Sequence, residues 1–389
     1  GQVQVAQYIG RGDREEAHGY AQAAVQLSLL TGLAFSAMCV IFLHPLVGFF
    51  KLTDPEALDA AFAYTRVACG LLVFSFLALT LTGLYTAQGD SRTPFVANLI
   101  GLAINMVLDP VLILGLGPFP KLGAVGAAIA TVTAQFIVMG IMVLGVVFRK
   151  NENVLKGIHL YAKIPSKYLK GICKIGIPTA LQGMVYCAIS MVLTRMVSAY
   201  GAAAVAVQRV GGQIESVSWN TADGFAAALN AFIGQNYGAG KMDRVKKGYR
   251  ASLWTVGAWG LLITLAFVLL PGPIAKIFFY EPEAISIAVG YLIIIGFCEG
   301  FMCEELMTVG ALSGLGRTRL CSIISIIFTS ARIPLAVLLG GHMGLTGIWW
   351  AFSSTSIVKG IIFVLTFFYI TRETKNGDKK FHGSMKKFL

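Results

Sequence analysis

Residues 123–147 read GAVGAAIATVTAQFIVMGIMVLGVV, an apolar stretch without a single Asp, Glu, Lys or Arg. About 20 such residues in a helix cross the hydrocarbon core of a bilayer. Lipid offers no partners to backbone N–H and C=O groups, so a stretch of this kind crosses a membrane as a helix. This stretch decides the fold class, because similar stretches make up most of the chain.

Nine further apolar stretches predict nine more spans, which makes the protein all-α and integral to a membrane. The predicted ranges are 21–43, 62–85, 94–116, 175–198, 202–233, 251–270, 285–312, 320–339 and 344–370. The composition agrees, with 56% hydrophobic and 13% charged residues, against about 45–50% and about 25% in soluble proteins. It excludes a soluble enzyme, a disordered chain and a secreted disulfide scaffold.

The basic residues predict the orientation in the membrane. Of the 31 Lys and Arg, those inside predicted spans are Arg66, Arg195, Arg209, Arg332 and Lys359. All the others except Lys51, Lys121 and Lys276 fall in alternate connections or near the two ends. Cytoplasmic loops carry such an excess, so we expect these connections and the C-terminus on the cytoplasmic side of the cell (inner) membrane. Topology thus explains the net charge of +12, and no nucleic-acid partner is expected.

Short motifs recur in order along the chain and predict an internal repeat. QYIGRG at 7–12 resembles QNYGAG at 235–240, GDSRT at 89–93 resembles GLGRT at 314–318, and GAVG at 123–126 resembles GLTG at 344–347. Ordered anchors of this kind are typical of two homologous bundles. The predicted domains are an N-lobe (1–150), a cytoplasmic linker (151–174), a C-lobe (175–371) and a basic tail (372–389).

The repeat also predicts the helices of the complete protein. In the C-lobe, two predicted spans precede the Gln-x-x-Gly-x-Gly turn, whereas in the N-lobe only Gly1–Ala6 precede it. We therefore expect six spans in each lobe, ten of which this sequence contains. An even number per lobe puts both repeats in the same orientation.

These motifs, together with NMVLDP at 105–110 and GALSGLGRT at 310–318, resemble the MATE (multidrug and toxic compound extrusion) family. The resemblance runs from Gln7 to about Thr371, and it is closest to the bacterial and archaeal branch with a cation site in the N-lobe. It implies two lobes around a V-shaped cavity and alternating access. It also implies export of organic cations or amphipathic drugs in antiport with H⁺ or Na⁺. We expect a monomer without enzymatic activity and without a cofactor other than the coupling ion.

Asp109 is the first candidate for a coupling site, because ionisable residues inside spans are costly and mark function. Asn98, Asn105 and Asp109 share one helix face, and Pro110 removes a backbone donor directly after the carboxylate. A carboxylate, an amide oxygen and free carbonyls are ligands of hard cations such as Na⁺. By resemblance, Asn105 and Asp109 match the N-lobe cation site and Thr131 a further ligand. The Asp that this branch has on its first helix is absent from the sequence. The structural alternative is that Asp109 caps a kinked helix.

The repeat gives a check on Asp109. The C-lobe equivalents of Asn105, Asp109 and Pro110 are Thr329, Ile333 and Pro334. The proline persists while the acid does not, which favours an ion site in one lobe. Arg332, next to Ile333, is expected to neutralise an acid in the C-lobe.

Polar residues in the C-lobe spans predict the substrate cavity. Glu305 matches a glutamate of the same branch by resemblance, and it would attract a cationic drug or form an interlobe ion pair with an arginine. The other residues expected to line the cavity are Gln182, Gln213, Glu215, Asn220 and, in the N-lobe, Asn98.

Two other functions stay open at the level of sequence. A flippase for lipid-linked saccharides would show several cavity arginines, for which the four intramembrane arginines are candidates. A channel or a membrane-embedded enzyme is the third alternative, but the sequence has neither a His-Glu-x-x-His pair nor a complete phosphate loop.

Overall fold

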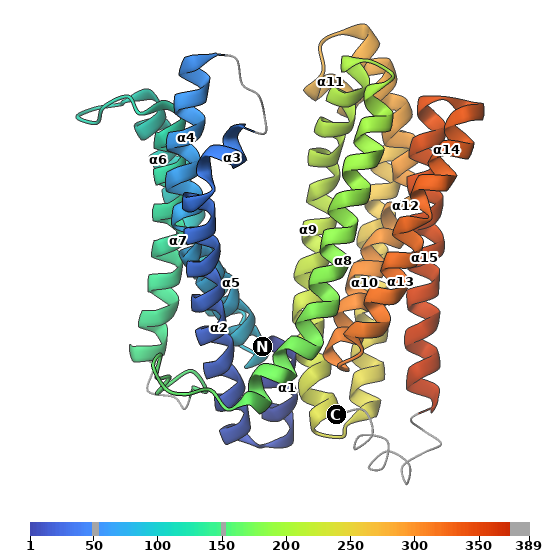
Figure 1. The fold of residues 1–389 in the computed structure, drawn as a ribbon. Coiled ribbons are helices and arrows are strands. Elements are labelled where there is room, and N and C mark those ends of the chain that lie inside the picture. Colours follow the sequence, from blue (N-terminus) through green and yellow to red (C-terminus); the bar gives the residue numbers. More distant parts are fainter. Residues whose placement is uncertain (49–53, 149–152, 374–389) are drawn as a thin grey trace. The chain divides into compact units, whose positions relative to one another are not determined.

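The computed structural model describes residues 1–48, 54–148 and 153–373, and every regular element within them is an α-helix (Figure 1). This confirms the all-α prediction. By the contacts between residues, the chain divides into a first unit, Gly1–Ile172, and a second unit that begins at Cys173. The lobe, linker and tail boundaries expected from the sequence stay predictions. Residues 374–389 of the expected tail lie outside the described residues.

The first unit is built from helices of unequal length. They are α1 (Gln2–Arg11), α2 (Arg14–Ile41), α3 (Leu43–Gly48), α4 (Pro55–Gly70), α5 (Leu72–Ala87), α6 (Arg92–Leu114) and α7 (Gly123–Phe148). The next helix, α8 (Ser166–Ser198), begins in this unit and ends in the second.

The second unit continues with helices that, from α10 onward, resemble those of the first unit from α2 onward in their order of long and short segments. They are α9 (Ala202–Gly238), α10 (Met242–Leu269), α11 (Pro271–Phe278), α12 (Pro282–Gly314), α13 (Thr318–Ser330), α14 (Arg332–Met343) and α15 (Leu345–Glu373). Thus α2 corresponds to α10, α3 to α11, α4 with α5 to α12, α6 to α13 with α14, and α7 to α15. The order agrees with the internal repeat read from the sequence.

The Gln-x-x-Gly-x-Gly turn has the same backbone conformation in both repeats. Gly12 follows α1 with φ +80°, and Gly240 follows α9 with φ +73°. Side chains other than that of glycine rarely adopt this left-handed region. The second glycine of the motif therefore ends a helix in the same way in both repeats.

The two repeats differ where their helices are interrupted. In the first unit, α6 runs continuously through Pro110. In the second unit, the corresponding segment stops at Ser330 and restarts at Arg332. The same backbone plan is thus broken beside Arg332 and not beside Asp109.

Within the described residues, nine helical segments are long and apolar enough to cross a membrane. They correspond to nine of the ten predicted spans, and two of them combine a pair of helices, α4 with α5 and α13 with α14. The tenth prediction, 202–233, lies within α9, which is a helix but does not meet the same apolar criterion. Arg209, Glu215 and Asp223 interrupt its apolar character.

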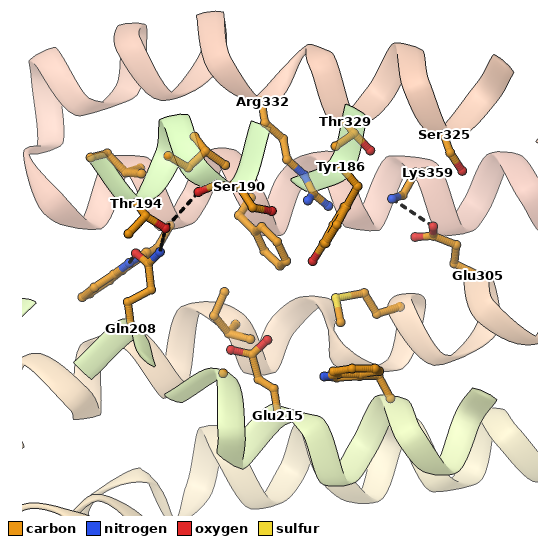
Figure 2. Close-up of a pocket in the computed structure, with 18 of the residues that line it drawn as sticks. Tyr186, Ser190, Thr194, Gln208, Glu215, Glu305, Ser325, Thr329, Arg332 and Lys359 are labelled. Carbon is orange, nitrogen blue, oxygen red and sulfur yellow. Dashed lines mark hydrogen bonds and ion pairs between the residues drawn. The ribbon is translucent and has the colours of Figure 1, made fainter. Parts of the chain in front are cut away.

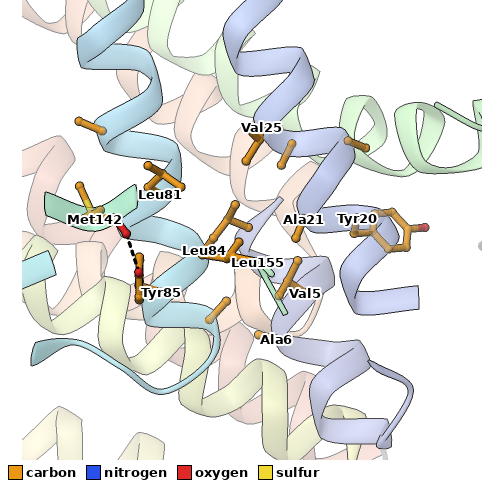
Figure 3. Close-up of a cluster of buried hydrophobic side chains, with 14 of the residues drawn as sticks. Val5, Ala6, Tyr20, Ala21, Val25, Leu81, Leu84, Tyr85, Met142 and Leu155 are labelled. Atoms are coloured by element: carbon orange, nitrogen blue, oxygen red, sulfur yellow. Dashed lines mark hydrogen bonds between the residues drawn. The ribbon is translucent and has the colours of Figure 1, made fainter. Parts of the chain in front are cut away.

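Small residues let α1, α2 and α5 pack closely in the first unit. Ala6, Ala21 and Leu84 are almost completely buried where these helices meet (Figure 3). Small side chains allow helix backbones to approach, which favours van der Waals packing. The Tyr85 hydroxyl donates a hydrogen bond of 2.7 Å to the carbonyl oxygen of Met142, which joins α5 to α7.

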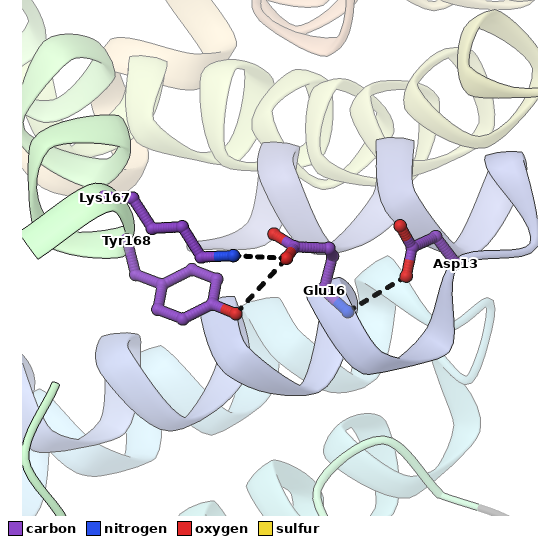
Figure 4. Close-up of polar contacts among 4 residues, drawn as sticks. All are labelled: Asp13, Glu16, Lys167 and Tyr168. Atoms are coloured by element: carbon purple, nitrogen blue, oxygen red, sulfur yellow. Dashed lines mark hydrogen bonds and ion pairs between the residues drawn. The ribbon is translucent and has the colours of Figure 1, made fainter. Parts of the chain in front are cut away.

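The connection before α8 is bound to α2 within the first unit. The Gln26 side-chain amide donates to the carbonyl oxygens of His159 (2.6 Å), Leu160 (3.0 Å) and Ala162 (3.0 Å). Glu16 accepts from Lys167 and Tyr168 at the start of α8 (Figure 4). The connection is therefore ordered by buried polar groups of α2 and by a half-exposed ion pair.

Helix α12 packs backbone against backbone with its neighbours. A Cβ atom added at Gly310 would lie 2.5 Å from the carbonyl oxygen of Ala226 on α9, and one added at Gly260 on α10 would lie 2.7 Å from Cα of Gly300. No side-chain layer separates these helices at the crossings. Helix α12 therefore has a closely fixed position in the second unit.

We expect Gly310→Ala to destabilise the protein by about 1–3 kcal/mol, because the added methyl group meets backbone atoms that have no room to move. The measurement is the thermal unfolding midpoint of the purified protein in detergent. Gly290→Ala is the matched control on the same helix, since a Cβ there meets nothing within 4 Å. Equal midpoints for the two variants would contradict the close packing.

Candidate functional site

The first unit contains a buried polar pair on α6. Asp109 and Asn105 lie one turn apart, and both side chains are partly buried. Asp109 Oδ1 and Asn105 Nδ2 are shielded from solvent and have no hydrogen-bond partner among the described residues. Pro110 lacks the N–H that the carbonyl of Met106 would otherwise accept. The pair therefore presents unsatisfied polar atoms beside an unpaired carbonyl, an arrangement that suits a cation or a proton.

Two other residues expected to belong to this site are exposed in the structure. Thr131 is on α7 and is exposed in the described structure. Asn98 is also exposed, and its side-chain amide donates to the carbonyl oxygen of Pro94 at 2.7 Å. The structure thus brings Asn105 and Asp109 together, but Asp109 Oδ1 accepts no hydrogen bond from Thr131.

The second unit contains a cavity of about 520 Å³ (Figure 2). This volume falls in the range of about 300–1,000 Å³ typical of ligand pockets. Its walls come from α8, α9, α12, α13, α14 and α15. Of the residues expected to line a substrate cavity, Gln182, Glu215 and Glu305 line this one.

Helical spacing explains why these side chains meet. Gln208, Gly212, Glu215 and Trp219 of α9 are three or four residues apart and share a face. On α8, the same spacing aligns Gln182, Tyr186, Ser190 and Thr194. Hydrogen bonds link α15, α9 and α8 in the cavity wall, since Trp349 Nε1 donates to Gln208 Oε1 (3.5 Å) and Gln208 Nε2 donates to Thr194 Oγ1 (3.4 Å).

Glu305 forms an ion pair inside the second unit. Its Oε1 lies 2.9 Å from Nζ of Lys359 on α15, and both side chains are buried. The partner that the structure gives to Glu305 is thus a lysine of the same unit. Because the two charges compensate each other, Glu305 does not present a free negative charge to the cavity.

Glu215 is likewise bound by a neighbour. The Tyr291 hydroxyl of α12 donates a hydrogen bond to Glu215 Oε1, and both side chains are buried. Gln213 and Asn220, expected on the same cavity wall, are exposed on α9 and are not among the residues that line this cavity. Glu215 is therefore the residue of α9 that carries a charge into the cavity.

Arg332 differs from the other charged groups of the cavity. Its Nε donates to Thr355 Oγ1 (3.1 Å), its Nη2 donates to Ser356 Oγ (2.9 Å), and its Cζ lies 4.0 Å from the ring centroid of Phe352. The side chain is 3% exposed, and none of the ion pairs among the described residues includes it. Glu215 and Glu305 interact with this guanidinium electrostatically without forming an ion pair with it, so the expectation that Arg332 neutralises an acid of this unit stays a prediction.

The described residues contain no cluster of side chains that would form a typical metal site. No group of three or more His, Cys, Asp or Glu side chains is arranged there to hold a metal ion. Asn105 and Asp109, the two residues suggested for Na⁺, would need further oxygen ligands from the backbone.

Sequence reasoning overlooked the partners that define the cavity. Lys359 was recognised only as a charge inside a span, and Tyr291 and Trp349 were not singled out. The spacing of Gln182, Tyr186, Ser190 and Thr194 was a signal that could have placed α8 in the wall. The approach of Lys359 to Glu305, by contrast, depends on the packing of α12 against α15 and has no signature along the chain.

Comparison with known families and proteins gives consistent matches. The MatE family model matches residues 2–111 and 178–338. A probable multidrug resistance protein NorM of Thermotoga maritima is 29% identical over 375 residues, which cover 94% of this chain and 78% of that protein. An FAD transporter of Shewanella oneidensis is 26% identical over 356 residues, which cover 91% of this chain and 78% of that protein.

Solved structures share the fold. The MATE transporter VcmN of Vibrio cholerae in the bent form superposes with a TM-score of 0.85 at 21% identity, covering 96% of this chain and 83% of that one. A MOP superfamily transporter of Pyrococcus furiosus gives a TM-score of 0.88 at 21% identity with the same coverage. At this identity the likeness concerns the fold alone.

The buried ion pair generates a prediction on stability. Lys359→Met would leave the Glu305 carboxylate buried without a counter-charge, at a cost of about 3–5 kcal/mol. The double variant Lys359→Met/Glu305→Gln removes both charges and should recover most of the lost thermal stability. If the two single losses simply add in the double variant, the residues do not act as a pair.

Proposed function

Because the MatE match covers most of the chain, the protein belongs to the MATE family of membrane transporters, and we propose that it exports small organic molecules in antiport with H⁺ or Na⁺. Membership of a transporter family means that it is a multi-pass membrane protein and not an enzyme. The coupling ion, the substrates and the alternation between two states belong to the proposal.

The pair Asp109 and Asn105 carries the proposed coupling. Asp109 Oδ1 is buried without a hydrogen-bond partner among the described residues, a state that is costly unless a proton or a cation compensates it. In the other unit, the equivalent position is Ile333. An acid that is not needed at the same place in both repeats is better explained by ion binding than by a role in the fold.

The relatives support small organic molecules as substrates. One is named as a multidrug resistance protein and another as an FAD transporter, so the substrates suggested by these names are not limited to cations. The cavity of the second unit has a size suited to a drug-like molecule. We propose that this cavity contributes to substrate binding through its side chains on α8, α9 and α15.

In the proposed cycle, the coupling site and the cavity influence each other through a change of conformation of the protein. A coupling ion at Asp109 and a substrate in the cavity must prefer different conformations, because a ligand shifts an equilibrium only by its differential affinity. Binding of the ion then lowers the affinity for the substrate, which leaves on the outer side. The ion is then released on the inner side, and the protein returns to the conformation that binds the substrate.

The flippase alternative receives less support. A carrier of lipid-linked pyrophosphates would gather several arginines, but in the described part of the second unit Arg332 lines the cavity whereas Arg195 and Arg209 are exposed. One arginine does not form the cluster that such a headgroup needs. We therefore propose a soluble or amphipathic small molecule as the substrate.

The proposed coupling predicts that Asp109→Asn loses gradient-driven export. Cells without other exporters that express the variant should accumulate ethidium to the level of cells without the transporter, whereas wild-type expression lowers accumulation until a protonophore or removal of Na⁺ abolishes the effect. Val107→Ala is the control, because Val107 is 63% exposed on the same helix, and it should leave efflux unchanged. Normal efflux by a membrane-inserted Asp109→Asn protein would refute the role of Asp109.

The proposed orientation predicts which engineered cysteines react in intact cells. Tyr280→Cys, between α11 and α12, is 91% exposed and should react with a membrane-impermeant maleimide from outside. Lys241→Cys, in the basic connection between α9 and α10, should react only after the cells are permeabilised. Wild-type protein controls for its own cysteines, of which Cys187 is exposed. The opposite pattern would invert the topology.

A further inference from the structure

Glu299 of α12 is a buried acid whose charge no neighbouring group compensates. Its side chain is 0% exposed, and neither carboxylate oxygen has a hydrogen-bond partner among the described residues. Ser218 of α9 interacts with the carboxylate without forming an ordinary hydrogen bond, and its hydroxyl oxygen lies 3.2 Å from Sγ of Cys303. An ionised, unpaired carboxylate is very costly to bury, and such a group takes up a proton instead.

The charged group that acts on Glu299 from α9 has the same sign. It is Glu215, and the two carboxyl groups interact electrostatically. Glu215 accepts a hydrogen bond from the Tyr291 hydroxyl and is attracted by the Arg332 guanidinium. These contacts favour the ionised form of Glu215, and Glu299 has no such support. Two carboxylates in one low-dielectric region do not readily ionise together, so Glu299 is the member of the pair that holds a proton.

The positive charges of the helices packed against α12 are exposed or engaged with other acids. On α15, Lys359 lies 2.9 Å from Glu305, and on α14, Arg332 interacts with Glu215 and Glu305. Helix α10 has its charged residues in positions 243–250, and positions 251–269 contain none. Lys276 of α11 and Arg319 of α13 are exposed. The other titratable groups that interact with Glu299 are uncharged donors of α12 itself, namely Tyr291, Cys298 and Cys303.

A proton suits this place better than a metal ion. Hard cations such as Ca²⁺ take about six to eight oxygen ligands, and the described residues contain no group of three or more His, Cys, Asp or Glu that could hold a metal. A proton needs one oxygen and no open volume, and Glu299 does not line the cavity. Glu215 does line it (Figure 2), so the acid pair borders the cavity on one side.

We propose that the second unit binds a proton at Glu299, in a site formed with Glu215 and separate from Asp109 of the first unit. The ligand is H⁺, and its uptake or release changes the charge beside the cavity by one unit. The inference goes beyond the proposed function, because it places a titratable site in the unit to which no coupling was assigned. It needs neither a substrate nor an ion gradient.

Infrared difference spectroscopy of the purified protein tests the proposal, because a protonated carboxyl group absorbs as a carbonyl, apart from the carboxylate bands. We expect the wild type at neutral pH to have a protonated-carboxyl band that Glu299→Gln lacks. Glutamine matches a protonated glutamate in shape and charge, so the variant should unfold at the same temperature as the wild type at neutral pH.

The same two proteins should differ at alkaline pH. Glu299 is protonated in the folded protein and ionised in the unfolded chain, so unfolding releases a proton and a rise in pH favours it. The thermal unfolding midpoint of the wild type should therefore fall more steeply from neutral to alkaline pH than that of Glu299→Gln. Parallel curves for the two proteins would contradict a proton at Glu299.

Matched variants separate the site from other acids. Glu283→Gln changes an exposed acid in the first turn of the same helix and should keep the protonated-carboxyl band. Glu215→Gln removes the neighbouring negative charge, so the band should disappear at a lower pH than in the wild type. If Glu299→Gln does not fold, this shift in folded Glu215→Gln decides the outcome.

Three results would overturn the proposal. They are a neutral-pH spectrum that Glu299→Gln leaves unchanged, a band whose titration does not shift in Glu215→Gln, and a band that appears only when choline replaces Na⁺. The last result would assign the site to a metal cation. Asp109→Asn should keep the band, so failure of the proposed coupling and failure of this proposal are distinguishable.

Discussion

A bilayer offers neither hydrogen-bond partners nor counter-charges, and the structure follows from this constraint. Backbone groups are satisfied inside helices, so the regular structure of the described residues is helical throughout. Side chains follow the same rule in part, since two buried acids of the second unit have partners within it, Glu305 with Lys359 and Glu215 with Tyr291. The buried atoms without a hydrogen-bond partner among the described residues include Asp109 Oδ1 in the first unit and both carboxylate oxygens of Glu299 in the second, and such atoms are costly unless a proton or a cation compensates them.

The two units share a backbone plan and differ in chemistry. The repeat gives α6 in one unit and α13 with α14 in the other, with a proline at the same place in both. In the first unit the residue before the proline is Asp109, and in the second it is Ile333, with Arg332 one position earlier. The segment before the proline thus presents an acid in one unit and, one position further from the proline, a base in the other. A duplicated bundle can divide two tasks, coupling and recognition, without a change of fold.

The sequence predicted the helices well because apolar length and the positions of charges act locally. It predicted the membrane class, the repeat and nine of the segments that are apolar enough to cross a membrane. Segment 202–233 is a helix but less apolar than expected, since polar residues such as Glu215 serve the cavity and not the lipid. The sequence predicted less well which side chains bind the buried charged residues. The sequence left Glu305 open between attracting a cationic drug and pairing with an arginine, and it did not indicate the partners that the structure gives. The partners of Glu305 and Arg332 are Lys359, Thr355 and Ser356, which all lie on α15, and only tertiary packing places that helix beside them.

The backbone contacts of α12 bear on how specificity diversifies in evolution. Backbones are in direct contact where Gly310 meets Ala226 and where Gly260 meets Gly300. These crossings therefore have no side chains between the helices that substitutions could change. A lineage that changes its substrate would have to keep α12 in place and exchange lining residues elsewhere. Helix α8 is a more permissive place for such exchange, because its lining residue Tyr186 is 48% exposed, whereas Tyr291 and Ile295 of α12 are buried. Paralogues with different substrates should therefore differ first in the sequence of α8, while the glycines of α12 stay the same.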